Sequence, residues 1–529
     1  MLERDYISPG RSAALGENGM AATSHPLATT TAIDVLRAGG NAMDAALAAV
    51  AVQCVVEPAM TGIGGDCFAI VAPAGKAPIA FNGSGRSPKA ASAPALRDQG
   101  MTQIAARSAH AVTIPGAVDA WCQLSEAYGS MGLDRLLQPA IDLAENGYRV
   151  TGRVALDWAR YQSTVATDAD AAACYLPGGK PPRTGEKFVH KQLAESLRRI
   201  ARAGRAGFYE GPVAEEIVTK LKAMGGPHAL EDFADYRGDF VEPISARFRG
   251  HDVLECPPNG QGLAALVMLR ILDGFDLSDS AVSEADRVHL LAEASNAAYT
   301  MRDLLIADPA TMRVPVQDIL SDRFIGDLRG KIALDRVQPP AIWTDAVHRD
   351  TVYISVVDKD GNVVSLINSI FNAFGSGILA PQSGVLLQNR GSGFSLIQGH
   401  PNELAGGKRP LHTIIPALVM KDGKPLMPFG VMGGQFQAVG HTHFLSHMFD
   451  RGFDPQRANE APRSFAFNGT LTMEAGFGDA VRADLVRRGH SVAWAEDPIG
   501  GCQAIYIDHQ RGLLIGGSDH RKDGLALGY

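Results

Sequence analysis

The stretch from Asp350 to Ser369, DTVYISVVDKDGNVVSLINS, constrains the fold of this 529-residue chain more than any other segment. Apolar residues dominate 352–357 and 363–367, and the turn-forming residues DKDGN separate the two runs. This pattern predicts a β-hairpin. Thr351 stands directly before the first strand, where threonine is common for purely structural reasons. The hairpin alone therefore leaves open whether Thr351 does more than begin a strand.

The sequence before residue 351 and the sequence after it differ in their patterns of apolar residues. Helical periodicity dominates the first part, whereas short apolar strands dominate after residue 351, which predicts an α+β fold built from layers with antiparallel sheets. The segment Asp335–Asp350 contains Pro339-Pro340 and no periodicity, and is interpreted as an exposed linker. The expected helices are Thr29–Ala38, Ala42–Cys54, Ala117–Tyr128, Leu133–Asn146, Glu284–Leu305 and Gln437–Phe449. The expected strands are Val352–Val357, Val363–Ile367, Gly384–Leu387, Leu418–Lys421, Ala504–Ile507 and Leu513–Gly516.

The composition argues against several binding partners and cellular compartments. The net charge is −8 and no run of Lys or Arg occurs, which argues against nucleic acid and anionic membranes as partners. The N-terminus lacks the pattern of a secretory signal, and Ala42–Val56 is too short to span a bilayer. The six cysteines have no CxxC spacing and stand mostly in apolar or helical surroundings. A reducing cytoplasm is the expected compartment.

Most of the short motifs that could indicate a catalytic or binding site match their known patterns only in part. HTHFLSH at 441–447 spaces two histidines by four residues on a predicted helix, but a metalloprotease glutamate is missing, so packing is the expected role and no metal site is predicted. Gly62–Asp66 and Gly83–Arg86 resemble phosphate loops without the Walker or Rossmann pattern. Ser395 is not in a GxSxG motif. Gly433-Gly434, before a predicted helix, could form either an oxyanion hole or a plain tight turn.

Several longer motifs, in order along nearly the whole chain, resemble the γ-glutamyltransferase family of N-terminal-nucleophile hydrolases. These motifs are Val35–Ala46, Gly62–Asp66, Thr113–Gly116, Gly207–Gly211, Pro257–Gly262, Thr351–Asn362, Phe374–Ile378, Lys408–Leu411, Met432–Gly434 and Gly516–Tyr529.

The resemblance implies a four-layer αββα sandwich and a precursor that cuts itself between Asp350 and Thr351. Residues 1–350 would form a large subunit and residues 351–529 a small one, intertwined in one domain as an αβ heterodimer that could pair further. Cleavage would make the Thr351 hydroxyl the nucleophile and its freed α-amine the base, since such an amine titrates near neutral pH. Ser369 stands where the family has a second threonine, and Gly433 and Gly434 match the family's oxyanion glycines.

The residues that grip the substrate depart from the family's pattern. Gly393 and Phe371 stand where the family holds the γ-glutamyl α-ammonium with an Asp and an Asn. His412-Thr413 replaces the serine pair that holds the α-carboxylate. Losing the anionic partner would leave a desolvated ammonium unpaired.

Two arginines are candidates for a carboxylate instead. Arg390 appears where the family often has a glutamine, and Arg86 is displaced by two residues from the family's early arginine. This pattern is similar to that of the oxamate amidohydrolases and cephalosporin (glutaryl) acylases within the family. The expected activity is therefore hydrolysis of a small carboxylate-bearing amide, without a cofactor.

Two other functions stay open. One is glutathione hydrolase or γ-glutamyltransferase activity with altered contacts. The other is a non-catalytic or metal-binding relative that never matures. The acyl group accepted, the acceptor and the oligomeric state do not follow from the sequence.

Overall fold

The computed structural model describes residues 6, 7, 9–339 and 351–529, and its centre is a pair of stacked β-sheets. The expected linker is described only as far as residue 339, where the chain has no regular secondary structure. Its remainder and the residue before the expected cleavage point, Asp350, lie outside the described residues.

Each of the two large sheets has seven strands. The first runs in the order β1 (Ala14–Gly16), β20 (Leu513–Ser518), β19 (Gly501–Asp508), β15 (Lys424–Met432), β14 (Ala417–Lys421), β9 (His251–Glu255), β8 (Ile244–Phe248). The second runs in the order β21 (Leu525–Gly528), β2 (Gly19–Thr23), β10 (Val352–Asp358), β11 (Val363–Ser369), β3 (Asp66–Ala72), β4 (Ile79–Gly83), β7 (Asp239–Val241). Neighbouring strands in both sheets are antiparallel, as expected.

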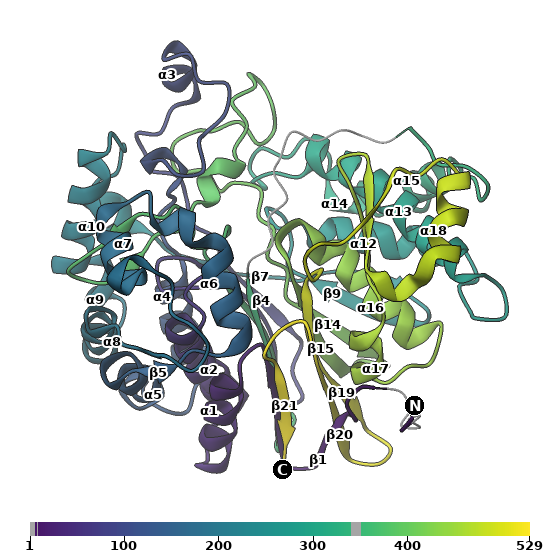
Figure 1. The fold of residues 1–529 in the computed structure, drawn as a ribbon, viewed down its shortest axis with the longest axis horizontal. Coiled ribbons are helices and arrows are strands. Elements are labelled where there is room, and N and C mark those ends of the chain that lie inside the picture. The colour runs from purple at the N-terminus through teal and green to yellow at the C-terminus, as the bar shows by residue number, and fades with distance from the viewer. Residues whose placement is uncertain (1–5, 8, 340–350) are drawn as a thin grey trace.

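Helices cover the outer face of each sheet, so the expected four-layer αββα sandwich is confirmed (Figure 1). The side of the second sheet holds α1 (Pro26–Arg37), α2 (Ala42–Val56), α4 (Ala117–Tyr128), α5 (Leu133–Asn146), α6 (Gly152–Val165), α7 (Ala169–Tyr175), α8 (Lys191–Ala203), α9 (Ala206–Tyr209), α10 (Pro212–Ala223) and α11 (Leu230–Asp235). The short helix α3 (Ala93–Asp98) projects away from this layer and packs in a small cluster with Phe394, Leu396 and Leu404 (Figure 1). The side of the first sheet holds α12 (Gly262–Leu272), α13 (Glu284–Leu305), α14 (Val316–Ile319), α15 (Asp322–Arg329), α16 (Gln437–Phe449), α17 (Pro455–Glu460) and α18 (Gly478–Arg487). Within the described ranges, none of these helices is long and apolar enough to cross a bilayer.

The described residues also form three smaller sheets outside the two large ones. They pair β5 (Tyr148–Arg149) with β6 (Lys187–Phe188), β12 (Leu379–Ala380) with β13 (Val385–Leu386), and β16 (Ser464–Phe467) with β17 (Thr470–Met473) and β18 (Val492–Trp494). The pair β17–β18 is parallel.

The predicted hairpin is β10–β11, with Val352 opposite Asn368 and Val357 opposite Val363. Every residue of both strands is buried, because helices cover one face and the other sheet covers the opposite face. The side chain of Asp358 shapes the turn by accepting hydrogen bonds from the N–H groups of Asp360 (3.0 Å) and Asn362 (2.9 Å). The hairpin thus lies in the middle of the sandwich, with Thr351 at its edge.

Both the segment before Thr351 and the segment after it contribute strands to both large sheets. The core between the sheets joins Met20, Phe68 and Leu254 from the first segment with Tyr353 and Ile505 from the second. Two fragments produced by a cut before Thr351 would therefore share one core, and separating them would expose it to water.

Gly430 on β15 sets how closely the sheets approach each other at β10. A Cβ atom built on Gly430 would lie 2.3 Å from the ring of Tyr353. We expect Gly430→Ala to lower the free energy of unfolding by about 1–3 kcal/mol, because overpacked cores must shift to relieve such a contact. Urea unfolding measures the change. Gly326→Ala, at a helical position with nothing within 4 Å of the added methyl group, is the matched control and should be neutral or stabilising. Equal effects of the two substitutions would contradict this account.

Candidate active site

Thr351 lies directly before β10, and it is buried. Its hydroxyl donates a hydrogen bond to the Ser369 hydroxyl at 3.3 Å, across the end of the hairpin. It also accepts one from the Gln437 side-chain amide, Nε2, at 3.2 Å. The predicted neighbour Ser369 therefore contacts Thr351, as expected, and Gln437 is an additional contact.

Gln437 was not predicted as a site residue. It is the first residue of α16, directly after the 3₁₀ turn Gly434–Phe436, and its Oε1 accepts a hydrogen bond from the Ile415 N–H at 3.1 Å. That second bond fixes the orientation of the amide, so its N–H group points at Thr351. The position of Gln437 at the start of a predicted helix, behind two glycines, was the only signal in the sequence.

Gly433 and Gly434 form the turn between β15 and α16, and both need glycine. Their φ angles are +126° and +56°, values that side-chain-bearing residues rarely adopt. Gln261 holds the turn by donating from Nε2 to the Gly434 carbonyl at 3.0 Å. No hydrogen bond in the described part of the chain uses the N–H of Gly433 or Gly434. Two adjacent buried N–H groups that the described protein does not use are the elements from which an oxyanion hole is built.

A cavity of about 220 Å³ borders this turn on one side. Apolar side chains dominate its lining, which includes Gly433 and Gly500 together with Phe436, Phe465, Phe467 and Ile499. An uncharged, apolar group of a ligand would fit this environment better than a charged one.

Arg390 is fully buried, although arginine is seldom buried without a partner. Its Nη1 donates to the Thr413 hydroxyl at 2.8 Å, and its guanidinium lies 3.8 Å from the centre of the Phe371 ring. Nε and Nη2 are buried with no hydrogen-bond partner in the described structure. Phe371 itself has a φ of +77°, an unusual backbone conformation for a phenylalanine. Its N–H donates to the Ser369 hydroxyl at 3.0 Å, which links the arginine pocket to Thr351.

His412 is adjacent to this pocket but is occupied by the protein. Its Nε2 donates to the Asp66 carboxylate at 2.9 Å, and its Nδ1 accepts from the Ile414 N–H at 3.3 Å. Burial and the charge of Arg390 lower the pKa of His412 to about 4, so the imidazole is neutral at pH 7. With both ring nitrogens in use, His412 positions Asp66 and the pocket wall, and its direct contact with a ligand stays a prediction.

Asp66 connects the separate parts of the site. It is the last residue of the motif Gly62–Asp66, but no role of its own was predicted for it from the sequence. It lies opposite Ser369 in the pairing of β3 with β11. Besides His412, its carboxylate accepts hydrogen bonds from the Gly85 N–H (2.9 Å), the Gly116 N–H (3.2 Å) and the Gln388 amide (2.8 Å).

Arg86 is in a different environment from Arg390. Its side chain is 37% exposed and lies 3.5 Å from Asp239 and 3.9 Å from Asp308, in an ionic cluster that also contains Arg409. Gly393 belongs to the short 3₁₀ turn Arg390–Gly393, beside the arginine pocket. Of the predicted substrate-binding residues, the structure therefore brings together Arg390, Thr413 and Phe371, with His412 behind them.

The histidines of HTHFLSH bind other protein groups. His441 pairs with Glu255 at 2.7 Å, His443 Nε2 donates to the Pro462 carbonyl at 2.9 Å, and His447 Nδ1 donates to the His443 carbonyl at 2.9 Å. Packing and hydrogen bonding within the core thus account for this motif.

Comparison with known proteins identifies the family. The profile of the γ-glutamyltranspeptidase family matches residues 28–529. The chain belongs to the γ-glutamyltranspeptidase family. This confirms the family seen in the sequence motifs and makes the chain an enzyme of the N-terminal-nucleophile hydrolase type.

Relatives within the γ-glutamyltranspeptidase family carry several activities in their names. The chain is 37% identical to a glutathione hydrolase-like YwrD proenzyme of Bacillus subtilis, covering 97% of this chain and 99% of the relative. It is 34% identical to an oxamate amidohydrolase proenzyme of Klebsiella pneumoniae, covering 97% and 98%. The crystal structure of a cephalosporin acylase from Bacillus halodurans superposes with a TM-score of 0.93 at 38% identity, covering 100% and 99%.

We expect the Gln437 contact to affect turnover. Gln437→Met removes the donor to Thr351 and the acceptor of the Ile415 N–H, whereas Gln437→Glu removes only the donor. Both variants should lower kcat about two- to tenfold, the usual effect of one hydrogen bond, and Gln437→Met should also lower the Tm. Steady-state kinetics with the best amide substrate and thermal unfolding measure the two effects. A kcat within twofold of the wild type for both variants would show that the contact of Gln437 with Thr351 does not affect turnover.

The neutral state of His412 has a consequence for stability in acid. The unfolded chain binds a proton at this imidazole below pH 6.5, whereas the folded chain does so only near its pKa of about 4. The free energy of unfolding should therefore fall as the pH drops through this window. His412→Gln, which keeps a donor toward Asp66, should reduce the loss between pH 7 and pH 5 by about 2 kcal/mol. Urea unfolding at both pH values tests this, and an unchanged loss would show that His412 is protonated in the folded protein.

Proposed function

We propose that this protein is a self-processing amidohydrolase that cleaves the amide bond of a small substrate carrying a carboxylate. The observation that carries the proposal is the buried guanidinium of Arg390, with two N–H-bearing nitrogens that have no partner among the described residues. Leaving buried donors unsatisfied costs free energy, and a carboxylate would satisfy both at once. Burial lowers the pKa of Arg390 to about 9, which still leaves the guanidinium charged at pH 7.

Names of relatives support this class of substrate. Oxamate is itself a small amide with a carboxylate, and one relative is named an oxamate amidohydrolase proenzyme. A neighbour in structure is named a cephalosporin acylase, an enzyme of amide chemistry.

The reaction would begin with maturation of the chain. The relatives compared above are named proenzymes, and we propose that this chain also cuts itself between Asp350 and Thr351. The freed α-amine of Thr351 would then act as the base, because a terminal amine titrates near pH 7.7–8.0. In mid-chain Thr351 has no such group.

Acyl transfer would follow from the contacts of Thr351. Its hydroxyl, held by Ser369 and Gln437, attacks the amide carbonyl while its proton passes to the α-amine. The N–H groups of Gly433 and Gly434 stabilise the negative oxygen of the tetrahedral intermediate. The α-ammonium returns the proton to the leaving amine, and the C–N bond breaks to give an ester on Thr351. Water activated by the same amine then hydrolyses the ester and releases the carboxylic acid.

The apolar cavity beside Gly433 is the proposed place for the leaving amine. If Arg390 holds the acyl end by its carboxylate, the side of the substrate beyond the scissile bond is left for the cavity lined by Phe436, Phe465 and Phe467. Amides of apolar amines should therefore be better substrates than amides of charged amines.

A second candidate is glutathione hydrolysis or γ-glutamyl transfer, which the names of some relatives favour. A panel measuring amine or ammonia release from oxamate, glutathione, des-amino glutathione and glutaryl amides separates the two. Our proposal requires the des-amino analogue or another carboxylate-only amide to exceed glutathione in kcat/KM. Superior turnover of glutathione would support the second candidate.

The cytoplasm is the proposed compartment. All six cysteines are free, and Cys54, Cys67, Cys256 and Cys502 are buried. Unpaired cysteines are typical of reducing compartments.

Self-cleavage gives a direct test of maturation. The 529-residue chain should separate on a denaturing gel into fragments of 350 and 179 residues, and N-terminal sequencing of the smaller one should begin at Thr351. Thr351→Ala should remain one chain without activity, because it lacks the attacking hydroxyl. Cleavage of this variant would show that another residue performs the cut, and an uncut, inactive wild type would support a relative that does not mature.

Arg390→Gln tests the carboxylate contact. For a carboxylate-bearing amide, kcat/KM should fall at least about 30-fold, mainly through KM, because losing one partner of a buried charged pair costs about 2–5 kcal/mol. The matching amide with an esterified carboxylate should be affected much less, and self-cleavage should be intact. Arg86→Gln is the matched control in the separate ionic cluster. A KM within twofold of the wild type for Arg390→Gln would contradict the proposed pocket.

A further inference from the structure

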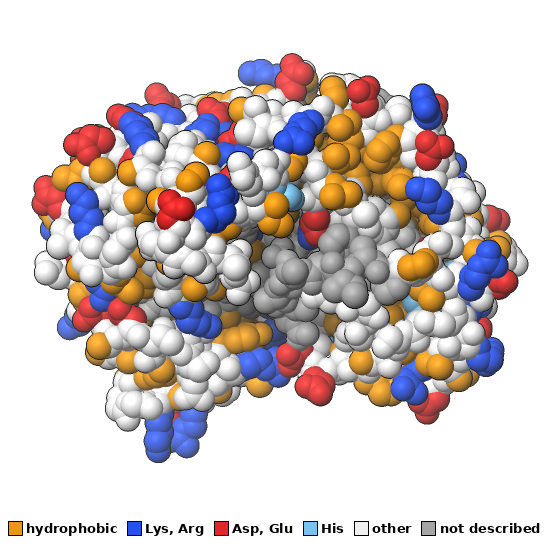
Figure 2. Space-filling model, turned by 90° about the horizontal axis from the view of Figure 1, so that it is seen from above, with side chains coloured by type: hydrophobic (Ala, Val, Ile, Leu, Met, Phe, Trp, Pro, Cys, Tyr) orange, Lys and Arg blue, Asp and Glu red, His pale blue; other side chains and the backbone are white. Residues whose placement is uncertain are grey.

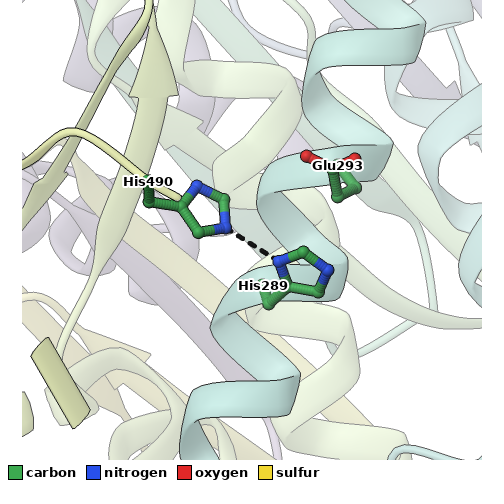
Figure 3. A group of neighbouring side chains, drawn as sticks. All are labelled: His289, Glu293 and His490. Carbon is green, nitrogen blue, oxygen red and sulfur yellow. Dashed lines mark hydrogen bonds between the residues drawn. The ribbon is translucent and has the colours of Figure 1, made fainter. Parts of the chain in front are cut away.

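Three side chains that commonly bind metals converge outside the active site, on the first sheet's side of the sandwich. His289 and Glu293 lie one turn apart on α13, and His490 reaches them from the loop between α18 and β18 (Figure 3). All three are buried, and one ligand atom from each lies within 4.8 Å of the others. We propose that His289, Glu293 and His490 form a binding site for a divalent transition-metal ion, with Zn²⁺ the best match to two nitrogens and one carboxylate.

A hydrogen bond to the main chain presets one of the two nitrogen ligands, that of His289. His289 Nε2 lies 2.7 Å from the Ala333 carbonyl, which can only accept, so this nitrogen carries the proton. His289 Nδ1 then carries the lone pair, which accepts a hydrogen bond from His490 Nε2 at 2.8 Å. A carbonyl that fixes the far nitrogen of a histidine is the usual outer-sphere arrangement at zinc sites.

The third ligand is prepared in the same way. Glu293 Oε2 accepts a hydrogen bond from the Gln338 N–H at 3.0 Å. Glu293 Oε1 is buried and makes no hydrogen bond in the described structure. Burial raises the pKa of Glu293, and the Gln338 N–H and the Asn296 side chain lessen this rise. A buried carboxylate oxygen without a donor is costly, and a bound cation would satisfy it.

The charged side chains around His289, Glu293 and His490 are compatible with a bound cation. Arg488 is the nearby positive group, and it is paired with Asp286 at 2.7 Å and with Asp484 at 3.1 Å. Asp335 adds a negative charge near His289. Both imidazoles are held in the neutral, ligating form by burial, which lowers the pKa of His289 and of His490.

Only small movements separate this arrangement from a metal site. Two nitrogens bound to one tetrahedral zinc ion lie about 3.3 Å apart, so the histidines would separate by about 0.5 Å. The proton of His490 would shift to Nδ1. A cavity of about 140 Å³ borders His490 and leaves room for water as a fourth ligand.

The location of the site suggests what it does. His289 and Glu293 precede Thr351 in the chain and His490 follows it, so the ion would join the two fragments of a cleaved protein. This bridging role rests on the proposed function, since it requires the cut before Thr351, whereas the metal site itself does not.

Metal titration of the full chain, free of an affinity tag and dialysed against a chelator, tests the site. Calorimetry with ZnCl₂ should show one site per chain, and about 100 times the dissociation constant of Zn²⁺ should raise the Tm by about 2–3 °C. Co²⁺ should give the visible absorption of a four-coordinate ion. Glu293→Gln keeps an acceptor for the Gln338 N–H and should weaken binding at least tenfold.

His490→Asn should also abolish the one-to-one site, whereas His509→Asn, at an exposed histidine, is the matched control and should bind as the wild type does. If His490→Asn does not fold, Glu293→Gln and the Co²⁺ spectrum still decide. Absence of one-to-one binding, or binding unaffected by Glu293→Gln, would overturn the proposal. If Thr351→Ala stays uncut and binds Zn²⁺ normally, the site stands independently of self-cleavage.

Discussion

The carboxylate of Asp66 is the interaction on which the candidate active site depends. It is buried at the start of β3, beside Ser369, and accepts four hydrogen bonds from groups far apart in the sequence. Two come from glycine N–H groups that allow the chain to approach closely, one from Gln388 and one from His412. A buried carboxylate requires such partners, so each of these segments is held in place by the same charge. Losing Asp66 would release both Ser369, which contacts Thr351, and His412, which adjoins the arginine pocket.

The same charge also explains why Arg390 can stay buried and ionised. Asp66 raises the pKa of Arg390 against the lowering caused by burial, although no direct hydrogen bond joins them. His412 stands between the two charges as a neutral group. The guanidinium therefore stays charged although no carboxylate in the described structure contacts it directly, and Phe371 and Ser369 link it to Thr351. The face of the molecule shown in Figure 2 has positive and negative side chains interspersed, so this face presents no large surface of one sign.

Local sequence patterns were sufficient to predict most of the helices and strands of the αββα sandwich. The helices Ala117–Tyr128, Leu133–Asn146, Glu284–Leu305 and Gln437–Phe449 have the expected bounds, because their apolar periodicity and end signals agree. The hairpin lies where it was expected, but its strands extend one and two residues further, to Asp358 and Ser369. The first helix was expected at Thr29 but begins at Pro26, since His25 caps it and proline suits the first turn. Less of the candidate active site than of the fold could be predicted from the sequence. Motifs located Thr351, Ser369 and the two glycines, but the roles of Gln437 and Asp66 arise from contacts between residues 86 and 346 positions apart. Such pairings depend on how the sheets stack, which no single stretch of sequence specifies.

The electrostatics of the arginine pocket bear on how the enzyme would select its acyl group. An α-ammonium placed near Arg390 would meet a like charge in a buried setting, where repulsion is weakly screened. Phe371 offers only its ring face, which the guanidinium already occupies, and Gly393 offers no side chain. Neutral His412 has no free lone pair, because both ring nitrogens are bound to protein groups. Selection against an amino-bearing acyl group would thus arise from repulsion and lost solvation as much as from attraction to a carboxylate, since specificity is a difference between two affinities. Such selectivity needs no new fold, because it follows from a few side chains around Arg390 on an αββα framework that the similar cephalosporin acylase structure shares.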